Sequence, residues 1–97
     1  MSMTVTEHLL TIVAEECAEV AQRCSKALRF GLDETRRGRD LNNAGMIMEE
    51  FDDLLAVVKM LQSEGSLPSS DKKRVKAKIK KVKKYLEYSG EVGTLSK

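Results

Sequence analysis

Hydrophobic positions recur every three to four residues along most of this chain, which is the period of an amphipathic α-helix. Three such segments are separated by polar or glycine-containing stretches, and we predict helices over about 4–30, 41–63 and 70–88. No stretch alternates apolar and polar residues as a half-buried strand does. We therefore expect an all-α fold.

Cap and turn residues mark the ends of the predicted helices. Thr4 and Glu7 have the spacing of a capping box, and Gly31 is placed to end the first helix. Residues 64–70 contain a glycine and the single proline, and they separate the second helix from the third. Asp71, or the serine before it, is a good N-cap for the third helix.

Each predicted helix has one apolar face. The faces consist of Leu9, Val13, Val20, Cys24, Ala27 and Leu28 in the first helix, Ala44, Ile47, Phe51, Leu54, Leu55, Val58 and Leu61 in the second, and Val75, Ile79, Val82 and Leu86 in the third. We expect the first two helices to pair as an antiparallel hairpin, with the third packed against it. Because three such helices bury only a thin core, a homo-oligomer, dimer or tetramer, would complete the bundle.

Composition indicates one soluble globular domain. The chain has 97 residues, 41% hydrophobic and 33% charged, and we expect a core over 4–88 with a surface tail over 89–97. No apolar run approaches the ~18–20 residues of a membrane span, and the first residues lack the pattern of a signal peptide. We therefore expect a cytoplasmic protein that does not enter a membrane. Cys17 and Cys24 lie on one predicted helix, so they offer neither a disulfide framework nor a metal knuckle.

Charge is divided unevenly along the chain. Residues 1–70 carry 12 acidic and 7 basic side chains, net −5, whereas residues 71–97 carry 3 acidic and 10 basic side chains, net +7. One hypothesis is therefore a non-enzymatic module that binds nucleic acid or another partner through the basic helix 72–84. That helix has no aromatic residue before Tyr85 and no helix-turn-helix pattern, so we favour a solvated basic face over nucleic acid as a partner.

Paired carboxylates are the most informative chemical feature. Glu16 and Glu19 are three residues apart, and Glu50 and Asp53 repeat that spacing on the next helix, so each pair shares one helix face. The helical period places Glu16 and Glu50 at the border of the apolar faces, whereas Asp52 points away. Such pairs also occur on solvated faces beside Lys or Arg. Their repetition on consecutive helices favours a divalent cation, and an all-oxygen ligand set favours Mg²⁺ or Mn²⁺.

The residues Glu15–Val20 followed by Glu50–Leu55 resemble the Glu-Glu-x-x-Glu … Glu-x-x-Asp signature of MazG-like, all-α nucleoside triphosphate pyrophosphohydrolases. The similarity covers about 9–61. The end of the chain, from Lys84 onward, is similar to small phage-borne members, which would place the protein in the host cytoplasm.

This resemblance implies Mg²⁺-dependent hydrolysis of nucleoside or deoxynucleoside triphosphates to the monophosphate and pyrophosphate. It implies that Mg²⁺, for which Mn²⁺ can substitute, is held by Glu16, Glu19, Glu50 and Asp53. Glu15 and Glu16 become the candidate catalytic residues, and Glu15 would orient a ligand or accept a proton from the attacking water.

Three further residues are candidates for binding the substrate. Arg23 and Lys26 follow the acidic motif on the same side of the helix as Glu19, where they can meet phosphates or remain solvated. Asn43 can contact the sugar or base, or it can cap the second helix.

Overall fold

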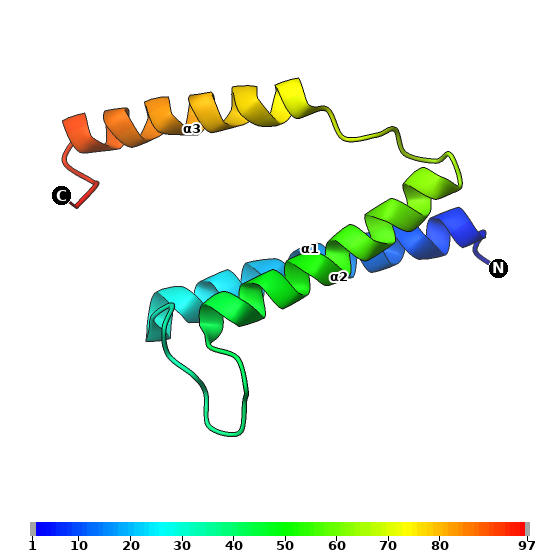
Figure 1. Ribbon diagram of the computed structural model, residues 1–97, viewed down its shortest axis with the longest axis horizontal. Helices are drawn as coiled ribbons and strands as arrows, with labels where there is room; N and C mark the ends of the chain where they lie inside the picture. The colour runs from blue at the N-terminus through cyan, green and yellow to red at the C-terminus, as the bar shows by residue number, and fades with distance from the viewer. Residues whose placement is uncertain (1, 97) are drawn as a thin grey trace.

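The computed structural model describes residues 2–96 and consists of three α-helices, α1 (Val5–Phe30), α2 (Asn43–Ser63) and α3 (Lys72–Glu91) (Figure 1). The described residues contain no strand, so the predicted all-α class is confirmed. α3 extends to Glu91, so the tail predicted over 89–97 begins three residues later than expected. Residues 1 and 97 of the predicted domain lie outside the described range. Within residues 2–96, none of the helices has the length and apolar character needed to cross a membrane.

The predicted caps are present. The Thr4 hydroxyl accepts a hydrogen bond from the Glu7 backbone N–H at 3.1 Å, and the Glu7 carboxylate accepts one from the Thr4 backbone N–H at 2.9 Å. Gly31 ends α1 with φ 97°, a conformation that favours glycine. Asp71 caps α3 by accepting a hydrogen bond from the Lys73 backbone N–H at 2.9 Å.

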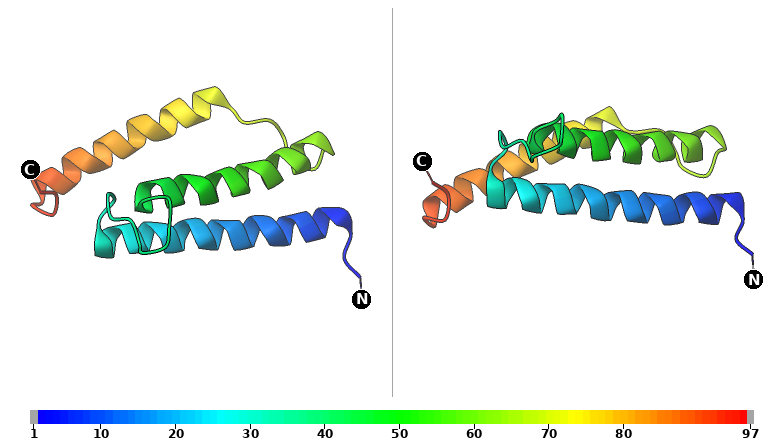
Figure 2. Two further views of the ribbon diagram at one scale, coloured as in Figure 1. Left: turned by 60° about the horizontal axis from the view of Figure 1, so that its bottom comes forward. Right: turned by 90° about the horizontal axis from the view of Figure 1, so that it is seen from below.

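α1 and α2 pack along their length as the predicted antiparallel hairpin (Figure 2). Its core is one layer thick, and the buried side chains are Leu9, Ala27, Asn43, Met46 and Leu61. Four residues predicted on the apolar faces of the first two helices remain exposed: Cys24, Leu28 at 88%, Phe51 at 43% and Leu55 at 38%. One partner helix covers only a stripe of its neighbour, so an apolar face that is wider than this stripe stays partly in solvent.

The prediction that the third helix packs against the hairpin is wrong. Among residues 2–96, α3 packs against neither α1 nor α2 and has no buried residue, and Figures 1 and 2 show it standing apart from the pair. The radius of gyration is 17.2 Å. A compact domain of this length would have a radius of gyration of about 12.5 Å.

Hydrogen bonds fix the start of the α2–α3 connection against the hairpin. The Thr6 hydroxyl on α1 donates to the Glu64 carboxylate at 2.7 Å, and the Ser66 hydroxyl donates to the same oxygen at 2.6 Å. The Gln62 side-chain amide donates to the Pro68 carbonyl at 3.1 Å. The connection is thus attached to the hairpin as far as Pro68, and Ser69 and Ser70 still line a groove on α2. α3 then runs back in the direction opposite to α2 (Figures 1 and 2).

Candidate functional site

Three carboxylates from both helices of the hairpin converge. Glu16 on α1 and Glu50 and Asp53 on α2 offer one oxygen each, and these oxygens all lie within 4.8 Å of one another. Glu16 and Glu50 are half-buried and Asp53 is exposed. The i, i+3 spacing brings Glu50 and Asp53 to one face of α2, and the antiparallel pairing brings Glu16 opposite them. We call this group the carboxylate cluster.

Two oxygens of the carboxylate cluster are buried without a partner. The Oε2 atoms of Glu16 and Glu50 are inaccessible to solvent and accept no hydrogen bond. A buried polar atom without a partner is costly, commonly about 1–3 kcal/mol. Their position therefore indicates that the folded hairpin holds acceptor capacity for a cation or a donor that the chain itself does not supply.

The charges around Glu50 also disfavour its ionised form. The adjoining carboxyl of Glu19, with which Glu50 can share a proton, together with burial and the negative charges of Glu19 and Asp53, raises the pKa of Glu50 above its ordinary value. Arg23 opposes this shift, because its Nε lies 3.6 Å from the Glu50 Oε1. The positive charge of Arg23 thus offsets only part of the negative charge of Glu19, Glu50 and Asp53.

The donor set suits a hard divalent cation. Every ligand atom is a carboxylate oxygen, the donor that Mg²⁺ and Mn²⁺ prefer, and the described residues bring neither histidine nor cysteine into the group. Oxygens bound to one Mg²⁺ at ~2.1 Å lie roughly 3–4 Å apart, so small side-chain rotations would bring these three together on one ion.

The structure brings three of the four predicted metal ligands together and leaves Glu15 outside the group. Glu16, Glu50 and Asp53 form the carboxylate cluster, and Glu19 adjoins it through Glu50. Glu15, predicted to be catalytic, is exposed and lies outside the cluster.

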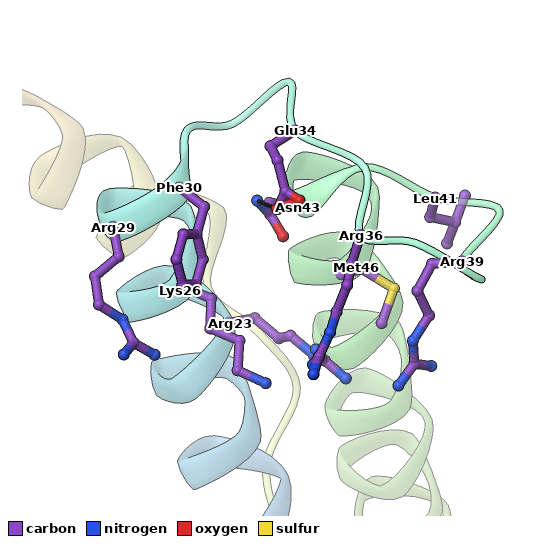
Figure 3. A pocket seen from close by; sticks show the side chains of 10 residues that line it. All are labelled: Arg23, Lys26, Arg29, Phe30, Glu34, Arg36, Arg39, Leu41, Asn43 and Met46. Carbon is purple, nitrogen blue, oxygen red and sulfur yellow. Dashed lines mark hydrogen bonds between the residues drawn. The ribbon is translucent and has the colours of Figure 1, made fainter.

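A basic pocket of about 420 Å³ occupies the closed end of the hairpin, between the last turns of α1, the α1–α2 connection and the start of α2 (Figure 3). Its lining includes the five cationic residues Arg23, Lys26, Arg29, Arg36 and Arg39. Figure 3 shows the charged ends of Arg23, Lys26, Arg36 and Arg39 gathered on one side of the pocket. Arg23 links the two features, because it lines the pocket and also pairs with Glu50.

Positive charges crowd around Lys26. Desolvation lowers the pKa of its ammonium, and the nearby charges of Arg23, Arg36, Arg29 and Arg39 lower it further. A cluster of like charges of this kind is relieved by a bound anion.

Asn43 has a structural role at the base of this pocket. Its buried side-chain amide donates to the Gly31 carbonyl at 2.8 Å and to the Glu34 carboxylate at 3.2 Å, which fastens the end of α1 to the start of α2. The N-cap of α2 is the preceding residue, Asn42, whose side chain accepts from the Gly45 N–H at 2.9 Å. All three predicted substrate-binding residues, Arg23, Lys26 and Asn43, line the pocket.

Apart from Asn43, sequence reasoning does not single out the non-cationic residues that line the pocket, which are Phe30, Glu34, Leu41 and Met46. Phe30 lies under the Arg29 guanidinium, 5.1 Å from it to the ring centre. An aromatic residue directly before the glycine that ends a helix is the one available signal, and it does not by itself indicate a pocket.

No family model, curated protein or solved structure matches this chain. The similarity to MazG-like enzymes therefore remains a prediction that rests on the acidic motifs of α1 and α2.

Proposed function

We propose that this protein hydrolyses nucleoside triphosphates to the monophosphate and pyrophosphate in a Mg²⁺-dependent reaction. The observation that carries the proposal is the carboxylate cluster, with two buried and unpartnered oxygens, directly beside a pocket lined by five cationic residues. An oxygen-rich cation site next to an anion-binding pocket is the arrangement that a metal–polyphosphate substrate requires.

The carboxylate cluster would hold the ion through Glu16, Glu50 and Asp53, with Glu19 adjoining. When bound, Mg²⁺ neutralises phosphate charge and activates water for attack on phosphorus. The unpartnered oxygens of Glu16 and Glu50 supply the acceptor sites for this ion.

Arg23 would orient the phosphates, because its guanidinium lies between the carboxylate cluster and the basic pocket. Lys26 and the arginines of the connection would bind the remaining phosphate charge. Phe30, in the pocket wall, offers an aromatic face on which a base can stack. In the reaction water attacks the α-phosphorus, the bond to the bridging oxygen breaks, and pyrophosphate leaves.

The test is a panel of nucleoside and deoxynucleoside triphosphates incubated with Mg²⁺ and assayed for monophosphate and pyrophosphate. We expect equal amounts of the two products and loss of the reaction with a chelator. Release of diphosphate and inorganic phosphate would contradict the proposed bond cleavage.

Paired variants connect the reaction to the site. Glu50→Gln keeps the size of a cluster residue and removes its charge, so turnover should fall by orders of magnitude. Asp52→Asn makes the same change on the same helix, at an exposed residue outside the cluster, and should leave turnover within a few-fold. The assignment fails if the Asp52 variant is the more damaged of the two.

A further inference from the structure

α3 carries an apolar surface that nothing within residues 2–96 covers. Val75, Ile79, Val82 and Leu86 follow one another at intervals of four, three and four residues, and they are 41–53% exposed. At ~100° per residue they fall within about 60° of the helix, which is a narrow stripe of the kind that packs against one other helix. We call these four residues the α3 seam.

α2 carries a matching surface on the side that faces away from α1. A groove of about 380 Å³ is lined by Phe51, Leu54, Leu55 and Val58, with Gln62 and Ser69 at one end. Phe51, Leu55, Val58 and Gln62 have the same four, three, four spacing as the α3 seam. We call this surface the α2 groove.

The α3 seam does not reach the α2 groove of its own chain. The connection is hydrogen-bonded to the hairpin up to Pro68, and Ser69 and Ser70 line one part of the α2 groove. α3 begins at Lys72 and runs back in the direction opposite to α2 without packing against it (Figures 1 and 2). The α3 seam and the α2 groove have the same periodicity and do not contact each other within one chain, so they can pair between two copies.

Charge favours the hairpin of a second copy as the occupant. Residues 1–70 carry net −5 and residues 71–97 carry net +7, so an α3 that approaches another hairpin meets opposite charge. Asp52 lies beside the α2 groove and Lys59 lines it, whereas Lys76, Lys78 and Lys83 flank the α3 seam. Pairing of two α3 helices would instead bring these lysines together, which is repulsive.

Area and composition favour the same occupant. The four residues of the α3 seam and three residues of α2, Met48, Phe51 and Leu55, are each 38–53% exposed to solvent. Seven such residues per copy, buried reciprocally, remove on the order of 1,000 Å² from solvent before the lysine stems are counted, which reaches the range of specific interfaces. A membrane-surface helix has a broader apolar face that includes Trp or Phe, and α3 has neither.

We propose that α3 of one copy docks into the α2 groove of a second copy, and that the exchange is reciprocal and forms a two-fold symmetric dimer. This inference does not rest on the proposed hydrolysis, because none of the residues of the α3 seam or the α2 groove belongs to the carboxylate cluster or the basic pocket.

Sedimentation of the full chain and of single variants tests the pairing. We expect wild type to be a dimer at micromolar concentration, and Ile79→Glu in the α3 seam and Phe51→Glu in the α2 groove to be monomers of unchanged helical content by circular dichroism. Ala77→Glu and Met60→Glu place the same side chain on the opposite faces of these two helices, and both should remain dimers.

Mixing the two monomeric variants distinguishes exchange from other dimers. The Ile79 variant keeps an intact α2 groove and the Phe51 variant an intact α3 seam, so an equimolar mixture should regain association that neither shows alone. Val82→Glu and Leu55→Glu repeat the test if either first variant loses helical content.

Other results would overturn the proposal. A Phe51 variant that stays dimeric would show pairing through α3 alone, and a dimeric Ile79 variant would show pairing through the hairpins alone. A mixture that does not associate, or a wild-type chain that is monomeric and binds vesicles of phosphatidylserine or duplex DNA through α3, would also exclude the exchange.

Discussion

Replacing Glu50 by glutamine should change the stability of the hairpin in opposite directions without and with Mg²⁺. The substitution keeps the shape of a side chain that is 13% exposed and removes its negative charge. It loses the 3.6 Å ion pair with Arg23, and it relieves the repulsion from Glu19 and Asp53. The introduced amide can also donate a hydrogen bond to the neighbouring carboxylates.

The magnitude follows from these opposing terms. A partly exposed ion pair contributes about 0–1 kcal/mol. A buried acceptor without a partner, such as the Glu50 Oε2, costs about 1–3 kcal/mol. We expect the metal-free variant to be more stable than wild type by about 1 kcal/mol, which raises the Tm of a domain of this size by roughly 4–8 °C.

Mg²⁺ should reverse the order of the two proteins. An ion that binds only the folded state stabilises wild type by about 2.7 kcal/mol at a concentration of 100 times its Kd, whereas the variant gains little. Thermal unfolding followed by circular dichroism, in chelator and in excess Mg²⁺, measures both effects, with Asp52→Asn as the matched control. If Glu50→Gln is destabilised by the same amount in both conditions, Glu50 is a structural partner of Arg23 and the reasoning is refuted.

Three further predictions concern the same hairpin. The pKa of Glu50 is raised above its ordinary 4.5, so protonation of this carboxyl stabilises the metal-free fold. The contribution is fully present below pH 4.5 and is lost as the pH rises through the folded-state pKa. In urea unfolding with chelator, the free energy of unfolding should therefore fall with rising pH in this range, and Glu50→Gln should remove that dependence. Asn43→Ala loses the hydrogen bonds to the Gly31 carbonyl and the Glu34 carboxylate and should lower the free energy of unfolding by about 1–3 kcal/mol; an unchanged urea midpoint would contradict the role of the amide in joining the helices. Lys26→Met should raise the KM for a triphosphate roughly tenfold, the effect of about 1.4 kcal/mol of lost binding, and steady-state kinetics with unchanged KM and kcat would contradict a phosphate contact of Lys26.

Local signals in the sequence predict the helices and their ends well. The capping box at Thr4, the glycine at Gly31 and the N-cap at Asp71 act within one turn, so they depend on few other residues, and the structure contains all three. The grouping of Glu16, Glu50 and Asp53 is also predictable, because helical spacing and antiparallel pairing are enough to bring them together.

Long-range placement is less accessible to sequence reasoning. The spacing of Val75, Ile79, Val82 and Leu86 indicates an apolar stripe but not the surface that covers it, and the expected contact with the hairpin of the same chain is absent from the described residues. The basic pocket depends on the path of the α1–α2 connection, which brings Arg36 and Arg39 beside α1, and no periodic pattern encodes that path.

Hydrolysis of a triphosphate with Mg²⁺ in water enriched in ¹⁸O would identify the attacked phosphorus and the metal-dependent reaction together. We expect mass spectrometry to find the label in the nucleoside monophosphate, with unlabelled pyrophosphate, and product formation lower by orders of magnitude with the Glu50→Gln variant. Label in the pyrophosphate, formation of a nucleoside diphosphate, or no hydrolysis of any triphosphate by the wild-type chain would contradict the proposed function.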